Sequence, residues 1–417
     1  MSLSCFELGE QMLSVDAARE ALTTLVGQPV AIETVALNQA YGRRLATDIT
    51  APINVPQNTN AAMDGVALAW PHTQPTQTTW PIAGDAVAGQ AFEGKVPFGY
   101  CVRITTGAPL PQGTDTIIMR EQLAEHADSV TIDTPSRVSH GQHVRQAGED
   151  IAAGEVALKS GTRLDAAGLG LVASLGYADV RVFKRPNVAI FSTGNEVTAP
   201  GKALPSAGIY DANRFTLIGL LNEQGAKAID LGILPDDPAA IQHALANAAQ
   251  QCDLVITSGG VSVGHADYTR DALEQLGQLA FWRVALRPGR PMACGWLGES
   301  RTPFVGLPGN PVAVMVTFAQ FVVPLLQRLQ GQPPSSPRRL TAIAQAPLKS
   351  RLNRTDFIRG IYSSDAQGVL HVQSTGAQGS GMLTSMVAAN CLIELGDDRD
   401  GAQPGEAVCI QPLTRWQ

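Results

Sequence analysis

The sequence predicts a multidomain protein of α/β plus β class, with an open, mostly parallel α/β sheet in the middle of the chain. Three observations support this prediction. Strand-like and helix-like segments alternate between residues 187 and 329, as they do in a parallel sheet with crossover helices. Residues 51–150 and 340–417 carry short β-type runs broken by Gly, Pro and Asp, which are typical of small β-rich modules. A length of 417 residues is enough for roughly two to four domains.

Two helices and a strand are expected on either side of the β-rich residues 51–150. A helix is predicted over residues 14–26, with Ser14 as its N-cap and Gly27 as its stop. A second helix is predicted around residues 164–175, followed by a strand at 180–183.

The alternating region supplies the elements of the central sheet. The predicted strands are 188–191, 228–233, 254–257, 281–286 and 304–305, and the predicted helices are 214–223, 237–250, 269–276 and 311–329. The most apolar stretch, 312–326, is too short to span a bilayer and contains Thr317, Gln320 and Pro324, so we expect a buried helix there. Residues 331–339 are rich in Pro and Ser and predict a linker to the last module.

Composition excludes several classes of function. Charged residues make up 16% of the chain, the net charge is −7, and no basic run is present, so we expect binding neither to nucleic acid nor to an anionic membrane. The six cysteines include no Cys-x-x-Cys pair, which argues against a zinc knuckle or a disulfide scaffold. The N-terminal segment lacks the basic region of a secretory signal. Together with the cysteine pattern, this segment favours a cytoplasmic location.

Four Gly- or Pro-rich loops follow predicted strands of the central region, at residues 192–196, 257–264, 287–291 and 306–311. In open α/β sheets, ligands bind outside the carboxyl ends of the strands. Glycines at 259, 260 and 264 would let the backbone approach an anion, and Pro311 suits the first turn of a helix whose N-terminus favours negative charge. Each loop alone is more often a plain turn, and only their convergence favours a site.

Charged side chains in these loops suggest which ligand the site would take. Arg287 and Arg290 flank a Pro-Gly turn and provide two forked cations for oxyanions. Glu196 and Asp267 provide the hard oxygen ligands that Mg²⁺ prefers beside a phosphate. Arg283 alone is better explained as a solvated strand residue, and His265 as a loop histidine without a ligand. The residues therefore predict a phosphorylated ligand, a divalent cation and a second anion.

The motifs, in their order along nearly the whole chain, resemble the MoeA-type molybdopterin molybdenumtransferase family, to which the gephyrin E domain is related. They are Ala62-Met-Asp-Gly65, Thr105-Thr-Gly-Ala-Pro109, Gly148-Glu-Asp-Ile151, Ser192-Thr-Gly-Asn-Glu196, Ile209-Tyr-Asp-Ala-Asn213, Ser258-Gly-Gly-Val-Ser-Val-Gly264 with Asp267-Tyr268, Arg287-Pro-Gly-Arg-Pro291 and Gly306-Leu-Pro-Gly-Asn-Pro311.

The resemblance implies four domains and a dimer. Residues 1–50 and 151–184 would form an elongated domain, 51–150 an inserted β-rich domain, 185–331 a molybdopterin-binding α/β domain, and 338–417 a β-barrel-like domain. The family forms a homodimer, and its active cleft joins the α/β and C-terminal domains of one subunit to the inserted domain of the other.

The resemblance also implies the reaction and its residues. Molybdate would be inserted into adenylylated molybdopterin, with Mg²⁺-dependent release of AMP. Asp64, Glu196 and Asp267 would be the catalytic and metal-binding residues. The remaining substrate-binding residues would be Thr106, Asp150, Ser258, Gly259, Gly260, Arg283, Arg287, Arg290, Pro308, Pro311, Arg354 and Ser380. The resemblance further suggests a molybdopterin adenylyltransferase as a partner, and it leaves open whether that partner transfers the substrate directly.

The chain departs from the family pattern at several positions, and alternative functions remain. Arg283, Arg287 and Arg290 stand where the family usually has Lys, Ala313 replaces a Ser, and His265 replaces a commonly acidic residue, which bears on the choice between molybdate and tungstate. The alternatives are a molybdopterin adenylyltransferase, a non-catalytic gephyrin-like scaffold, and an α/β protein that binds some other nucleotide. The intact carboxylates at 64, 196 and 267 favour an enzyme over a scaffold.

Overall fold

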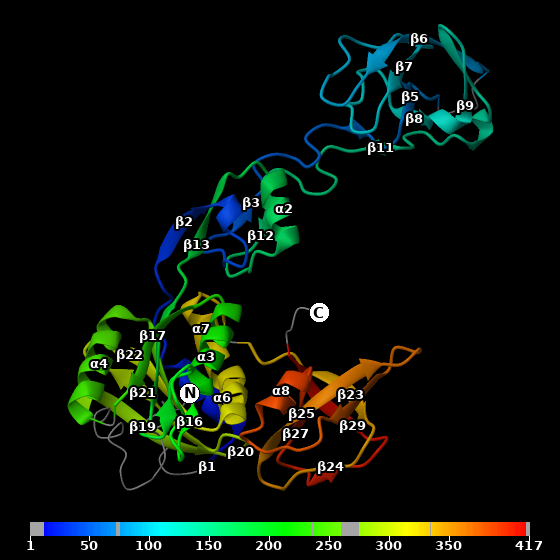
Figure 1. Ribbon diagram of the computed structural model, residues 1–417. Helices are drawn as coiled ribbons and strands as arrows, with labels where there is room; N and C mark the ends of the chain where they lie inside the picture. Colours follow the sequence, from blue (N-terminus) through cyan, green and yellow to red (C-terminus); the bar gives the residue numbers. More distant parts are fainter. Residues whose placement is uncertain (1–11, 72–75, 236, 260–274, 334, 414–417) are drawn as a thin grey trace. The chain divides into compact units, whose positions relative to one another are not determined.

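The computed structural model describes residues 12–71, 76–235, 237–259, 275–333 and 335–413. The chain divides into two compact units (Figure 1). The first unit combines Met1–Glu33 with Val182–Gln417, and the second is Thr34–Arg181. Each unit has its own cores and is described by itself.

A seven-stranded sheet forms the centre of the first unit, in the order β1-β19-β21-β22-β18-β14-β17. Its strands are β1 (Met12–Leu13), β14 (Asn187–Thr193), β17 (Lys227–Leu234), β18 (Leu254–Ser258), β19 (Gly277–Val284), β21 (Pro291–Leu297) and β22 (Thr302–Leu307). Four of the six pairings are parallel, which confirms the predicted α/β class. Strand β21, which the sequence analysis did not anticipate, runs antiparallel to β19 and β22.

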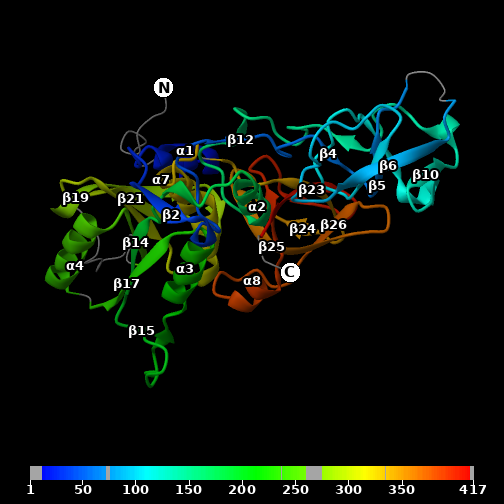
Figure 2. The same cartoon turned by 90° about the horizontal axis from the view of Figure 1, so that it is seen from above.

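The two faces of this sheet are covered by different helices (Figure 2). Alternate residues of β14 point to opposite faces, so Val188 and Ile190 join one core while Ala189 and Phe191 join the other. Helices α1 (Val15–Thr23) and α3 (Ala212–Glu223) contribute to the first core and α4 (Pro238–Gln251) to the second. The Ser14 side chain caps α1, as predicted, and the helix predicted over 269–276 falls largely outside the described residues.

The predicted helix over residues 311–329 is present and buried. It consists of α6 (Pro311–Thr317), a π-helical turn η4 (Phe318–Val322) and α7 (Val323–Leu329). By length and composition alone it could cross a membrane, but 72% of its most apolar window is buried inside the protein. Pro324 lacks an N–H to donate to the preceding turn, and the wider π turn precedes it.

Replacing Phe321 by alanine is expected to lower the free energy of unfolding of the first unit by about 3–5 kcal/mol, because its fully buried ring would leave a cavity. Phe215→Ala is the matched control, since that ring is 51% exposed on α3, and its cost should stay below about 1 kcal/mol. Urea unfolding followed by circular dichroism measures both. Equal costs for the two variants would contradict the assignment of Phe321 to the core.

A five-stranded barrel forms the C-terminal part of the first unit. Its strands are β23 (Leu340–Ala344), β25 (Thr355–Ser364), β26 (Leu370–Ser374), β27 (Cys391–Leu395) and β29 (Ala407–Pro412), and a β25–β27 pairing closes the ring. The predicted barrel-like fold is thereby confirmed. Two further short strands, β24 (Leu348–Lys349) and β28 (Gly401–Ala402), pair with each other, and helix α8 (Leu383–Ala388) follows β26.

One strand of the α/β region is added to the barrel sheet. Strand β20 (Leu286–Arg287) runs parallel to β25, with Leu286 opposite Thr355 and Arg287 opposite Asp356. The backbone N–H of Thr355 also donates to the carbonyl of Ala285. Arg287 is therefore held by backbone pairing beside the barrel, although it belongs to a loop of the α/β region.

The second unit is mostly β. A six-stranded sheet has the order β8-β5-β7-β6-β10-β9, with β5 (Gly65–Leu68), β6 (Thr79–Ala86), β7 (Cys101–Ile104), β8 (Thr116–Met119), β9 (Leu123–Glu125) and β10 (Ser129–Ile132). Short pairs join β4 (Asn60–Ala61) to β11 (Val144–Arg145) and β3 (Ile49–Thr50) to β12 (Val156–Leu158). Helix α2 (Ala166–Ser174) is capped by Asp165. The chain passes between the units through β2 (Ile32–Ala36) and β13 (Asp179–Phe183), which pair.

Candidate active site

Three of the predicted loops meet where β14, β18 and β22 end. Ser192 is opposite Ser258 in the β14–β18 register, and Ser258 is opposite Leu307 in the β18–β22 register. The N–H of Gly259 donates to the carbonyl of Leu307 at 3.0 Å. A Cβ added to Gly309 would lie 3.7 Å from the Cα of Gly259. The backbones of these loops are therefore in close contact, as expected at the carboxyl edge of a parallel sheet.

Two buried polar atoms lie in these loops without a hydrogen-bond partner among the described residues. Ser258 is 4% exposed, and its Oγ has none. Asn213 donates from Nδ2 to the carbonyl of Gly309 at 2.7 Å, while its Oδ1 has none. Buried polar atoms normally have partners, so such atoms point to a ligand or to neighbouring chain. The predicted residues Gly260 and Asp267, and with them His265, lie outside the described residues.

Glu196 is exposed and follows a glycine that its position requires. Gly194 has a φ of +129°, and a Cβ there would lie 2.7 Å from the Glu196 carboxylate. The positive φ favours glycine at this position, whereas the exposed Glu196 side chain could move away from a Cβ. The carbonyl of Glu196 accepts from the N–H of Ile209 at 2.8 Å, which joins the turn to β16 (Ile209–Tyr210) beside β15 (Val197–Thr198).

A partly buried ion network fixes the start of α3. Asp211 caps the helix and accepts from the Ser192 hydroxyl at 3.0 Å and from Arg214 Nε at 2.8 Å. Arg214 also donates to Asp230, and that hydrogen bond raises the pKa of the guanidinium. The pairing compensates the burial of Asp211 and Arg214 and holds the helix that carries Asn213.

The fourth loop, residues 287–291, also reaches this edge. Gly289 has a φ of +111°, and a Cβ there would lie 2.5 Å from Cγ2 of Thr317 and 3.6 Å from Cγ of Pro308. Only glycine lets the loop lie this close to α6. Pro308 is buried, and Pro311 is the first residue of α6, so the described parts of the four predicted loops, which for the second loop are residues 257–259, are brought together.

A small cavity of about 40 Å³ lies where Arg287 meets the barrel. Its lining contains three cations, Arg287, Lys349 and Arg359, and one carboxylate, that of Asp356. Arg354 forms an ion pair with Asp356, with Nε 2.8 Å from Oδ1. The geometry therefore gathers four cationic side chains around one carboxylate, an arrangement suited to an oxyanion.

Arg359 is a cation of this cavity that the sequence analysis missed. It is 1% exposed, and its guanidinium donates to the Ser385 hydroxyl and to the carbonyls of Gln378 and Gly379, at 3.0, 3.3 and 2.9 Å. Burial, with Arg287 nearby, lowers its pKa. It thus holds the loop that leads to Ser380, whose carbonyl accepts from the N–H of Val312 at the start of α6.

The other two predicted arginines lie elsewhere. Arg283 and Arg290 are exposed and do not line the small cavity. Arg283 is opposite Met12 in the β1–β19 pairing, and Arg290 Nη2 lies 3.9 Å from the sulfur of Met12. Of the three predicted arginines at 283, 287 and 290, Arg287 is therefore the one that lines the small cavity.

The second unit carries Asp64, Thr106 and Asp150. The Asp64 carboxylate is exposed and accepts from the N–H and the hydroxyl of Thr106, at 2.6 and 2.7 Å. These two hydrogen bonds lower its pKa, so the group stays ionised near neutral pH. Asp150 is also exposed, and its N–H donates to the carbonyl of Val55. Asp64 and Thr106 are thus in contact, as the sequence placed them in one module.

No group of three potential metal ligands is found in the described part of the chain. Of the three carboxylates predicted to bind metal, Asp64 belongs to the second unit, Glu196 to the first, and Asp267 falls outside what the structure describes.

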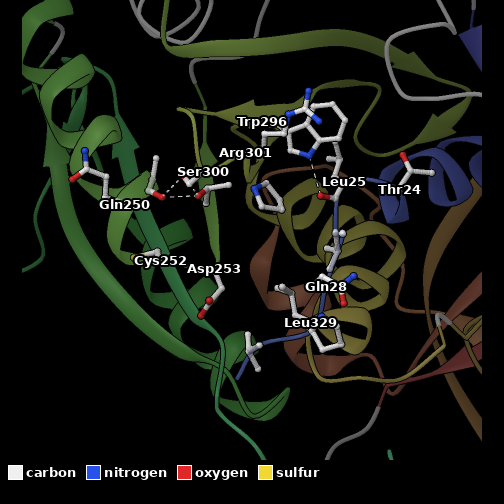
Figure 3. Close-up of a pocket in the computed structure, with 17 residues that line it drawn as sticks. Thr24, Leu25, Gln28, Gln250, Cys252, Asp253, Trp296, Ser300, Arg301 and Leu329 are labelled. Carbon is white, nitrogen blue, oxygen red and sulfur yellow. Dashed lines mark hydrogen bonds between the residues drawn. The ribbon is translucent and has the colours of Figure 1, made fainter. Parts of the chain in front are cut away.

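A pocket of about 640 Å³ lies at the amino ends of β18 and β22 (Figure 3). Trp296 donates to the carbonyl of Leu25 there, and Arg301 stacks 5.1 Å from the Trp296 ring. Burial raises the pKa of Asp253, whose carboxylate accepts from the N–H of Asn187. None of the predicted site residues lines this pocket, so it is separate from the candidate active site.

Family models match three successive parts of the chain. Residues 13–176 match the MoeA N-terminal region (domain I and II), residues 189–328 a probable molybdopterin binding domain, and residues 341–413 the MoeA C-terminal region (domain IV).

Similar proteins match over nearly the whole length. A molybdopterin molybdenumtransferase of Haemophilus influenzae is 44% identical over 96% of this chain and 99% of its own. Molybdopterin molybdenumtransferase 2 of Mycobacterium tuberculosis is 35% identical over 91% and 95%. The crystal structure of a molybdopterin biosynthesis moeA protein from Pyrococcus horikoshii OT3 matches with a TM-score of 0.82 and 28% identity, over 97% of this chain and 100% of that one.

Proposed function

The chain belongs to the MoeA family of molybdopterin molybdenumtransferases, and on that premise we propose that it inserts molybdate into adenylylated molybdopterin with Mg²⁺-dependent release of AMP. Its place is in molybdenum cofactor biosynthesis, and its class is transferase. We place the reaction in the cytoplasm, with a molybdopterin adenylyltransferase as the source of the substrate.

One observation carries this proposal: the cation-lined cavity lies beside the meeting point of the four strand-end loops. Arg287 belongs to one of these loops and also lines the cavity. The loops offer glycine backbone and the orphaned Ser258 hydroxyl to a phosphorylated pterin, while the cavity offers Arg287, Lys349 and Arg359 to molybdate. Both reactants would then be held next to each other, and positioning is the main contribution to such a transfer.

The carboxylates have the donor chemistry of a Mg²⁺ site. Glu196 is exposed at the strand-end loops, and the hydrogen bonds from Thr106 keep Asp64 ionised. We propose that Glu196 and Asp267 hold the ion together with Asp64, and that phosphate oxygens complete its shell. When bound, Mg²⁺ neutralises charge on the pyrophosphate link. The residues of the chain themselves orient the link and bind the departing AMP.

We further propose that Asp64 and Thr106 act in the active site of a partner subunit in a homodimer. Asp64 is exposed in a module of its own, with its carboxylate held in one orientation by Thr106. An exposed carboxylate fixed in this way is suited to complete a site on another surface. This arrangement would also explain why the three proposed metal ligands are distributed over both units.

Release of AMP from adenylylated molybdopterin tests the proposed reaction. With Mg²⁺, purified protein is expected to release AMP only when molybdate is added, and to form pterin that contains molybdenum. Chromatography measures AMP, and metal analysis of the isolated pterin measures molybdenum. Tight pterin binding without AMP release in either condition would support a scaffold instead. Adenylylation of molybdopterin from ATP would support the adenylyltransferase alternative.

A further inference from the structure

Asp356 is a buried carboxylate in a small cavity whose other charged lining residues, Arg287, Lys349 and Arg359, are all cations. It lies on β25, is 1% exposed, and is opposite Arg287 in the β20–β25 pairing. A carboxylate repels oxyanions, so its presence here needs a physical reason. The inference drawn from it rests on the proposed use of the cavity for molybdate.

The two arginines nearest Asp356 are bound to it to different degrees. Arg354 is bound to Asp356: its Nε lies 2.8 Å from Oδ1 of Asp356, and its Nη2 donates a hydrogen bond to Oδ2 at 3.2 Å. Arg287 is not, since its Nη1 lies 3.9 Å from Oδ2, which is beyond hydrogen-bonding distance. The Arg287 side chain is also 54% exposed. Arg287 therefore keeps its donors for a ligand, whereas Arg354 is held at Asp356 by an ion pair and one hydrogen bond.

The Asp356 carboxylate partly balances the positive charge of the cations around it. Arg287, Lys349, Arg354 and Arg359 would carry four positive charges in a small space, and burial, together with repulsion from Arg287, lowers the pKa of Arg359. One carboxylate at this point offsets part of that repulsion while no anion is bound. It also reduces the attraction of the cavity for every dianion, whatever its size.

We propose that Asp356 is a positioning and specificity-determining residue of the oxyanion cavity. Its carboxylate holds Arg354 in an ion pair, leaves Arg287 unbound at 3.9 Å, and lowers the net positive charge. Binding then depends on how well a tetrahedral dianion fits the available donors and less on charge alone.

Isothermal titration calorimetry with sodium molybdate and sodium sulfate tests this inference on the full-length protein without pterin. Asp356→Asn is expected to bind both dianions about tenfold more tightly, because one opposing charge is removed. The affinity ratio of molybdate to sulfate should fall, since the arginines lose their anchor. Arg354→Gln is expected to weaken both affinities about tenfold, because it leaves the carboxylate uncompensated, and the double variant should return close to the wild type.

Asp365→Asn is the matched control, because that carboxylate follows the same strand but is bound to His371 at the surface. It should leave both affinities unchanged. Unchanged or weaker binding in Asp356→Asn would overturn the inference. If that variant does not fold, unchanged binding in Arg354→Gln would overturn it equally. A wild-type protein that binds neither dianion at millimolar concentration would also overturn the inference. The proposed reaction is tested separately by AMP release.

Discussion

Replacing Arg359 by methionine is expected to lower kcat for molybdenum insertion by about a hundredfold or more, the usual effect of losing a preorganised electrostatic group. The change removes a cation that is 1% exposed in the cavity lining. It also releases the carbonyls of Gln378 and Gly379, which fix the loop before Ser380. Molybdate-dependent AMP release at saturating adenylylated molybdopterin measures the loss.

Two further variants show whether the charge of Arg359 or its set of hydrogen bonds matters for activity. Arg359→Lys keeps the charge but cannot reach several carbonyls in one plane, so its activity should lie between those of the wild type and Arg359→Met. Arg399→Met removes an arginine of the same barrel that binds Glu406 and does not line the cavity, and it should be nearly silent. Full activity in a folded Arg359→Met protein would remove Arg359 from the site.

Mixing Asp64→Ala with Glu196→Ala subunits is expected to restore activity that neither variant has alone. If the site is shared across a two-fold dimer, each heterodimer contains one intact site of two, so the purified heterodimer should give about half of wild-type activity and an unsorted random mixture about a quarter. The expectation rests on the separate units that carry the two carboxylates. Differently tagged subunits, refolded together and purified through both tags, provide the heterodimer for AMP-release assays.

The reverse mixture provides the control. Wild-type subunits paired with Asp64→Ala/Glu196→Ala double-variant subunits should give heterodimers with no working site if the site is shared. A site contained within one subunit predicts the opposite result in both mixtures. Activity in the second heterodimer and none in the first would therefore rule out the shared site.

The central fold could be predicted because its signals are local. The Ser14 cap, the alternating strands and helices, and the Gly- or Pro-rich loops all act over a few residues. Strand β21 was missed because its place depends on a hairpin with β22, whose turn places Gly298 and Arg301 at positive φ. No alternation of polar and apolar residues marks this strand, since most of it is buried on both faces.

The candidate site was predicted only where motifs mark it. Ser258 and Gly259 lie in loops whose glycines are visible in the sequence, and the structure brings these loops together. Arg359 lies within a β-strand and has no neighbouring motif. Its importance depends on the closure of the barrel, which brings residues 377–379 against its guanidinium. The pairing of Arg354 with Asp356 similarly required distances that spacing alone does not give.

The pairing of β20 with β25 makes the set of cations depend on two parts of the first unit. An isolated α/β module would retain the loops around Ser258 and Gly309, but only Arg287 among the four cations, because Lys349, Arg354 and Arg359 come from the barrel. A detached barrel would lose Arg287 and the strand that holds it. Under the proposed function, a cut between the two parts would therefore abolish molybdate binding even if each part folded alone.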